Sequence, residues 1–73
     1  MSKLPIISGI EAVKAFNRDG WFVARQTGSH SIMVKAGFEV TLSVPNHKEL
    51  DRGTLRTLIK LAGLTVDNFL SLL

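Results

Sequence analysis

The sequence lacks several residue types on which protein chemistry often depends. Its 73 residues include no cysteine, only two histidines, and six aspartates and glutamates. Without cysteine, a disulfide, a thiolate metal site and thiol catalysis are all excluded. The carboxylates show no spacing typical of metal ligands, no glycine-rich phosphate loop is present, and we expect no metal or other cofactor. The histidines remain as candidates for chemistry.

Long apolar runs are also missing. No run approaches the roughly 18–20 residues that a membrane span needs. The N-terminal residues Met1–Ile7 contain one lysine and a short apolar stretch that Pro5 interrupts, which is not typical of a signal peptide. We therefore expect a cytoplasmic protein.

What the chain does contain is apolar residues, at 45% of the sequence, and a net charge of +3. This composition argues against disorder. A chain of this length has room for one domain, residues 1–73, in which a fold buries only about 60% of the unfolded surface. The basic charge favours an anionic partner such as RNA, DNA or an acidic protein, although it also serves solubility alone.

The first periodic segment predicts a helix. Ser8 and Glu11 have the spacing of a capping box, in which each side chain bonds the other residue's backbone amide. Apolar residues then follow at helical spacing, namely Ile10, Val13 and Phe16. Asp19-Gly20 supplies a typical helix end. We predict a helix over residues 9–18.

Three segments rich in β-branched and aromatic residues predict strands. They cover residues 21–26, 30–35 and 38–44, separated by a turn at 27–29 and a tight connection at 36–37. The third segment alternates, with an apolar set that should face the core: Phe38, Val40, Leu42 and Val44. Pro45 should stop this strand. Of the adjacent Trp21 and Phe22, one should be buried.

The C-terminal third predicts two helices. After a polar connection at residues 46–51, apolar residues repeat at helical spacing up to Gly63, namely Leu55, Leu58, Ile59 and Ala62. Thr65 can cap a last short helix with apolar Val66, Phe69, Leu70 and Leu73. The order α-β-β-β-α, with an antiparallel meander, predicts a two-layer α+β domain of the double-stranded-RNA-binding type.

Two histidines are the candidates for proton transfer, because the ordinary pKa of histidine lies near neutrality, at about 6.5. His30 opens the second strand with the same parity as Ile32 and Val34. If those two residues face the helices, His30 lies at the helix-side rim of the sheet. It can equally be a hydrogen-bonded turn residue. His47 follows Pro45 and is either a second proton carrier, a phosphate ligand or an exposed loop residue.

Basic residues form a possible phosphate-binding surface. Arg52, Arg56 and Lys60 are spaced four residues apart and make one stripe on the second long helix, with Lys48 just before it. Amides at the start of that helix would add to it. Arg25 and Lys35 could extend the surface across the sheet. An ordinary solvated helix face explains the stripe equally well.

Four short motifs, in this order and spacing, resemble the HicA (YcfA-like) toxin family over nearly the whole chain. They are Gly28-Ser29-His30 after the strand at 21–26, Val44-Pro45-x-His47, Gly53-Thr54-Leu55-Arg56 and Leu61-Ala62-Gly63-Leu64. The resemblance implies a double-stranded-RNA-binding-type fold and mRNA cleavage without a metal, which arrests translation. It implies that His30 is catalytic, within the Gly28-Ser29-His30 motif, and that a HicB antitoxin covers the active site.

Under this resemblance we expect His30 to act as general acid or base. Arg52, Arg56 and Lys48 would hold phosphates, and His47 would be a possible second proton carrier. Two other functions remain open: a non-catalytic RNA-binding module of the same fold, and a protein-interaction subunit whose last helix is the interface. A pure RNA binder has no need of a histidine in the Gly-Ser-His turn, and a protein-interaction subunit should show no salt-dependent RNA affinity.

Overall fold

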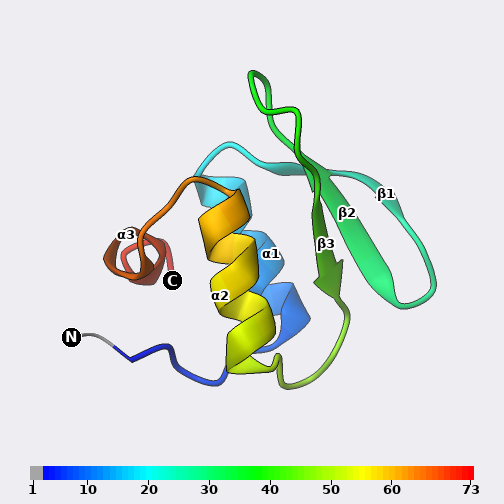
Figure 1. Cartoon of the computed structure of the whole chain (residues 1–73). Helices are drawn as coiled ribbons and strands as arrows, with labels where there is room; N and C mark the ends of the chain where they lie inside the picture. Colours follow the sequence, from blue (N-terminus) through cyan, green and yellow to red (C-terminus); the bar gives the residue numbers. More distant parts are fainter. Residues whose placement is uncertain (1–2) are drawn as a thin grey trace.

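The predicted order of elements is confirmed. A computed structural model describes residues 3–73, with two helices packed on one side of a three-stranded sheet and a short helix beside them (Figure 1). The elements are α1 (Gly9–Arg18), β1 (Phe22–Gln26), β2 (His30–Val34), β3 (Leu42–Pro45), α2 (Arg52–Leu61) and α3 (Val66–Leu70). This is the α+β arrangement of a double-stranded-RNA-binding-type domain. No helix within residues 3–73 is long and apolar enough to cross a membrane.

The sheet is an antiparallel meander in the order β1-β2-β3. On its inner face Ser31 lies opposite Val44 and Met33 opposite Leu42, and all four side chains are buried against the helices. Alternate residues of β2 therefore point to the outer face, which no helix of residues 3–73 covers (Figure 1). All of β1 is exposed, and its pairing with β2 is irregular between Val23 and Arg25.

Helix α1 has the predicted bounds, and its capping box is present. The Glu11 amide donates to Ser8 Oγ at 3.1 Å, and the Ser8 amide donates to Glu11 Oε1 at 3.0 Å. Gly20, with φ of +100°, follows the helix end. Ile10, one of the apolar residues at helical spacing, lies in the helix as predicted, but its side chain is 65% exposed. The buried side of α1 is formed instead by Ala12, Ala15 and Phe16.

Both C-terminal helices begin at side-chain caps. Asp51 accepts from the Thr54 amide at the start of α2, and Thr65 accepts from the Asn68 amide at the start of α3, as predicted for Thr65. Two expectations fail here. Leu50, within the predicted polar connection, is buried in the core, whereas Leu73, predicted among the apolar residues of the last helix, lies beyond α3 and is 46% exposed.

The third strand is shorter than predicted. It begins at Leu42, and it ends on Pro45 rather than before it. Phe38 and Val40 are therefore not core strand residues but lie partly exposed in the connection between β2 and β3. The reason lies with Trp21, which precedes β1 and is fully buried: the Phe38 ring packs on it with centroids 5.1 Å apart. Phe22 is the exposed member of the Trp21–Phe22 pair, on the outer face.

Candidate functional site

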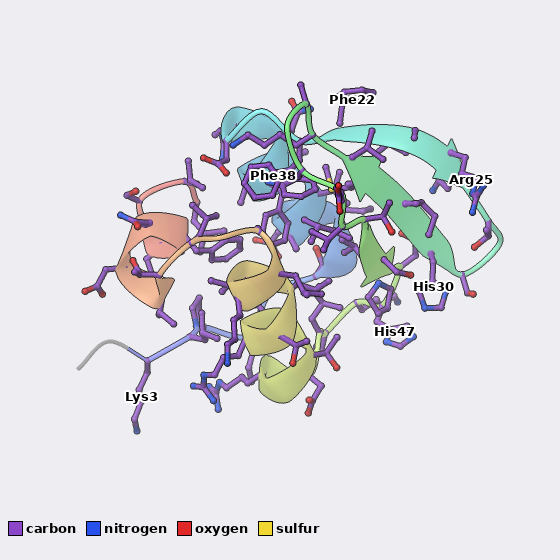
Figure 2. The ribbon with its side chains drawn as sticks, turned by 45° about the horizontal axis from the view of Figure 1, so that its top comes forward. Lys3, Phe22, Arg25, His30, Phe38 and His47 are labelled. Carbon is purple, nitrogen blue, oxygen red and sulfur yellow. The ribbon has the colours of Figure 1, made fainter. Side chains whose placement is uncertain are left out.

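His30 is the first residue of β2 and is half-buried. It pairs with Pro45 of β3, and the register directs its side chain to the outer face of the sheet. The helix-side position considered from the sequence is therefore wrong. Ser31 and Met33 fill the inner face, so Ile32, Val34 and His30 take the opposite one. Arg25, paired with Ile32, shares that face (Figure 2).

Three hydrogen bonds from the turn before β2 hold the backbone and the ring of His30 in place. The Thr27 amide donates to the His30 carbonyl at 2.9 Å, and the His30 amide donates to Thr27 Oγ1 at 3.1 Å. Ser29 Oγ and His30 Nδ1 share a hydrogen bond of 2.9 Å, whose donor depends on the tautomer. Nε2 has no hydrogen-bond partner among residues 3–73, so this nitrogen is the one available for proton exchange. Gly28 lies at the tip of the turn in open space.

The loop that carries His47 is tied to this turn and to α1. The Asn46 amide donates to the Ser29 carbonyl at 2.8 Å, and the buried Ser31 hydroxyl donates to Asn46 Oδ1 at 3.1 Å. On the other side the Gly9 amide donates to the His47 carbonyl at 2.9 Å. These bonds bring both histidines to the same end of the sheet, as Figure 2 shows.

A pocket of about 280 Å³ opens at this end of the molecule. It lies where the end of β1, the loop after β3 and the start of α1 meet, and its lining residues are Ser8, Ile10, Gln26, Asn46, His47 and Lys48. Of the predicted site residues, His47 and Lys48 line it. Gln26, Asn46 and Ile10 were missed from the sequence, because only the tertiary contacts bring their segments together.

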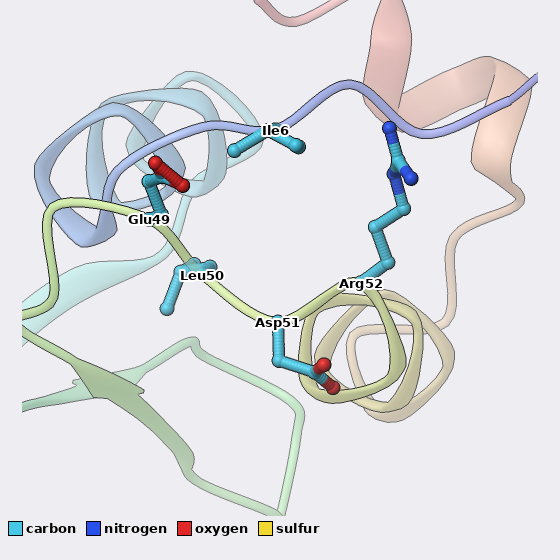
Figure 3. Close-up of a pocket in the computed structure, with 5 residues that line it drawn as sticks. All are labelled: Ile6, Glu49, Leu50, Asp51 and Arg52. Atoms are coloured by element: carbon cyan, nitrogen blue, oxygen red, sulfur yellow. The ribbon is translucent and has the colours of Figure 1, made fainter.

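A second pocket, of about 420 Å³, is lined by Ile6, Glu49, Leu50, Asp51 and Arg52 (Figure 3). Here Arg52 Nε donates to the Leu4 carbonyl at 2.8 Å and holds the N-terminal segment against α2. The two carboxylates disfavour a phosphate in this pocket. Arg52 therefore has a structural role in addition to the phosphate contact predicted for it.

The other predicted basic residues do not form one surface. Arg56 and Lys60 are exposed along α2. Lys35 follows β2 at the end opposite His30, where its ammonium group lies 3.2 Å from Asp19 and 5.2 Å from the centre of the Phe38 ring. Of the six basic residues, Lys48 directly follows His47 in the chain, and Arg25 lies on the same sheet face as His30. Within residues 3–73, no three His, Cys, Asp or Glu side chains cluster as metal ligands would.

The fold and this histidine-bearing turn define a small α+β domain of the double-stranded-RNA-binding type. A family model described as "HicA toxin of bacterial toxin-antitoxin" matches residues 9–64, from α1 to just beyond α2. The chain therefore belongs to the HicA toxin family of toxin–antitoxin systems. A comparison with curated proteins found no match.

Among solved structures, the chain is similar to a protein in a structure titled "Toxin-Antitoxin complex from Streptococcus pneumoniae". The two share 36% sequence identity with a TM-score of 0.70, over 80% of this chain and 98% of the other. The likeness extends to nearly the whole of the pneumococcal chain.

Proposed function

We propose that this protein is the toxin of a type II toxin–antitoxin system and cleaves mRNA without a metal ion, with His30 as general acid or base. The observation that carries the proposal is the fixed imidazole of His30. Its Nδ1 is hydrogen-bonded to Ser29, its backbone amide is bonded to Thr27, and its Nε2 is available on the open sheet face that also carries Arg25. The family membership supports the same activity.

RNA supplies its own nucleophile for this reaction. A base removes the proton of the ribose 2′-hydroxyl, whose oxygen attacks the adjacent phosphorus. The bond to the 5′-oxygen breaks, and an acid protonates that leaving oxygen, which yields a 2′,3′-cyclic phosphate and a 5′-hydroxyl. His30 Nε2 performs one of the two proton transfers, and His47 is the candidate for the other. DNA lacks the 2′-hydroxyl and is not a substrate by this route.

Cationic side chains would stabilise the charge that builds up on the phosphate. Arg25 shares the sheet face of His30, and Lys48 follows His47 in the tied loop. Arg56 and Lys60, which are exposed along α2, would hold more distant phosphates. Lys35 was expected to extend the phosphate-binding surface. Because it pairs with Asp19 at the far end of β2, it would contribute little to phosphate binding.

An antitoxin of the HicB type is the proposed protein partner, and it would silence the toxin by covering His30. The family is one of toxin–antitoxin systems, and the similar pneumococcal protein was solved in such a complex. Because the proposed substrate is mRNA, we place the activity in the cytoplasm.

The test compares the wild-type protein with His30→Ala and His47→Ala on a defined single-stranded RNA. Since general acid–base catalysis contributes about 10²–10⁴-fold, His30→Ala should lower the cleavage rate by that factor while RNA binding is kept. His47→Ala should cause a loss only if it is the second proton carrier. EDTA should have no effect. Full activity of His30→Ala would refute the assignment, and RNA binding without wild-type cleavage would indicate a binding module instead.

A further inference from the structure

Apart from His47 and Lys48, the residues that line the pocket beside the His47 loop have no role in the proposed cleavage. In the sheet register Gln26 pairs with the inward-facing Ser31, which places this pocket on the helix side of the sheet end. His30 lies around the same end on the outer face. The bond from the Asn46 amide to the Ser29 carbonyl joins the two regions directly. The pocket and His30 therefore lie around the same end of the sheet, on opposite faces.

One wall of the pocket is Ile10. At 65% exposure it is the most exposed of the large apolar side chains in the part of the chain that the structure describes. A single exposed isoleucine needs no explanation by itself. Here, however, it lies among polar residues in a concave site, where its aliphatic surface can pack on a flat ring.

The other walls offer hydrogen bonds. The side-chain amide of Gln26 has no hydrogen-bond partner among residues 3–73. It therefore presents both a donor, the NH₂ group, and an acceptor, the carbonyl oxygen. Asn46 uses Oδ1 to accept from the buried Ser31 hydroxyl, which fixes its amide and leaves Nδ2 as a donor. Lys48 adds a positive charge, and no lining residue is acidic. This set suits a planar group with acceptors and donors on its edge, joined to an anion.

We propose that this pocket binds the base of a nucleotide next to the cleaved phosphate and gives the enzyme a base preference at that position. Ile10 packs on the face of the base, Gln26 and Asn46 bond its edge, and Lys48 contacts the phosphate. The proposal rests on RNA being the substrate. Single-stranded RNA is the form whose bases can turn out into such a pocket.

The experiment uses a pool of short single-stranded RNAs with a randomised central segment. The cut ends are sequenced for the wild type, Gln26→Ala and Ile10→Ala. Matched controls are Asn68→Ala, another exposed amide, and Leu61→Ala, another exposed aliphatic residue on a helix; neither lines the pocket. A second arm sequences the RNAs that the non-cleaving His30→Ala protein retains, alone and combined with each pocket substitution.

The wild type should prefer certain bases at one position flanking the cut. Because a good side-chain pair to a base discriminates by about 5- to 150-fold, Gln26→Ala should reduce that preference by a similar factor at that position alone. Ile10→Ala should weaken it too, and both controls should keep it. A preference unchanged in both pocket variants would overturn the proposal while RNA cleavage stands.

If the wild type cuts no RNA, the proposed function fails, and the retention arm still decides whether the pocket reads a base. A third readout is binding to the antitoxin encoded beside the toxin gene. If Gln26→Ala and Ile10→Ala weaken that complex but leave every base preference intact, the pocket is a protein contact and the proposal is wrong.

Discussion

At the scale of single residues, the hydrogen bond between Ser29 Oγ and His30 Nδ1 leaves Nε2 as the ring nitrogen that would face the proposed RNA substrate. Ser29→Ala removes this bond while leaving the Thr27 clamp on the backbone. A neutral hydrogen bond contributes about 0.5–1.5 kcal/mol, so we expect kcat to fall roughly 2- to 10-fold with KM nearly unchanged. Steady-state kinetics on one RNA substrate measure both constants.

The control for this prediction is Ser29→Thr, which keeps the hydroxyl and should restore most of the rate. If Ser29→Ala raises KM without lowering kcat, Ser29 binds substrate and does not position His30.

Gly9 is the residue that allows α1 to approach the His47 loop. A Cβ built on it would lie 2.0 Å from the Pro45 carbonyl oxygen, so Gly9→Ala must push helix and loop apart. Overpacking of this kind costs about 1–3 kcal/mol, and we expect a loss of stability in that range together with reduced cleavage. Urea unfolding followed by Trp21 fluorescence measures the free energy.

Gly28→Ala is the matched control, because no atom lies within 4 Å of the added Cβ. It should change stability by no more than about 0.5 kcal/mol. An equally small change for Gly9→Ala would show that the approach of α1 to the loop is not tight.

At the scale of elements, local signals predicted α1 and α3 well because their caps lie within the elements' own sequence. The Ser8–Glu11 box and the Thr65 cap are contacts over three residues, which a pattern can show. The strand at 38–44 was overpredicted for the opposite reason. Apolar and polar residues alternate strictly in this segment. Phe38 nevertheless lies outside the sheet and packs on Trp21, seventeen positions earlier in the sequence.

The candidate site, like the third strand, depends on long-range contacts that the sequence pattern does not show. The Gly28-Ser29-His30 motif marked the turn, and the structure places it at an exposed end of the sheet. The face on which His30 lies depends on which parity of β2 is buried. The sequence left this parity open: a helix-side position for His30 required Ile32 and Val34 to face the helices. Ser31 is buried instead, since Asn46 satisfies its hydroxyl, and this long-range bond has no local signal.

The next prediction concerns helix α2 and asks whether its basic residues contact RNA phosphates. Arg56 and Lys60 are exposed, so each should contribute a phosphate contact if RNA follows this helix. Each alanine substitution should weaken RNA binding and reduce the slope of log affinity against log salt by about 0.7. The measurement is fluorescence anisotropy of labelled RNA at several salt concentrations, in the His30→Ala background to prevent cleavage.

Lys35→Ala serves as the control in that series, because its ammonium group is paired with Asp19. Its salt slope should match that of the parent protein. Equal slopes for all three variants would remove α2 from the RNA-binding surface.

At the scale of the whole molecule, one hydrophobic core joins every element except β1, whose five residues are all exposed. Leu4 of the N-terminal segment, Trp21 before β1 and Phe69 of α3 all belong to the buried cluster that also contains Met33 and Leu55. Because each element contributes only a few of these side chains, none is expected to be stable alone. We therefore propose that the described chain folds as one cooperative unit, the single domain that its length predicts.

Phe69→Ala tests this proposal at the buried core residue most distant in sequence from the sheet. Phe69 is fully buried, and its ring lies 5.0 Å from that of Phe16 in α1. Truncating a buried phenylalanine costs about 3–5 kcal/mol. A chain of this length has roughly 4–11 kcal/mol of stability in all, at about 0.05–0.15 kcal/mol per residue, so the variant should be largely destabilised. Leu73→Ala, at an exposed position, should change little.

The readouts are Trp21 fluorescence and far-UV circular dichroism during urea unfolding. Trp21 is fully buried, far from α3 in sequence, and its emission should shift when the core opens. If the chain is one unit, Phe69→Ala lowers the midpoint of both signals together. If Trp21 instead unfolds at the wild-type midpoint while helical signal is lost earlier, α3 is a separate, weakly docked element, and the sheet end that carries His30 does not depend on it.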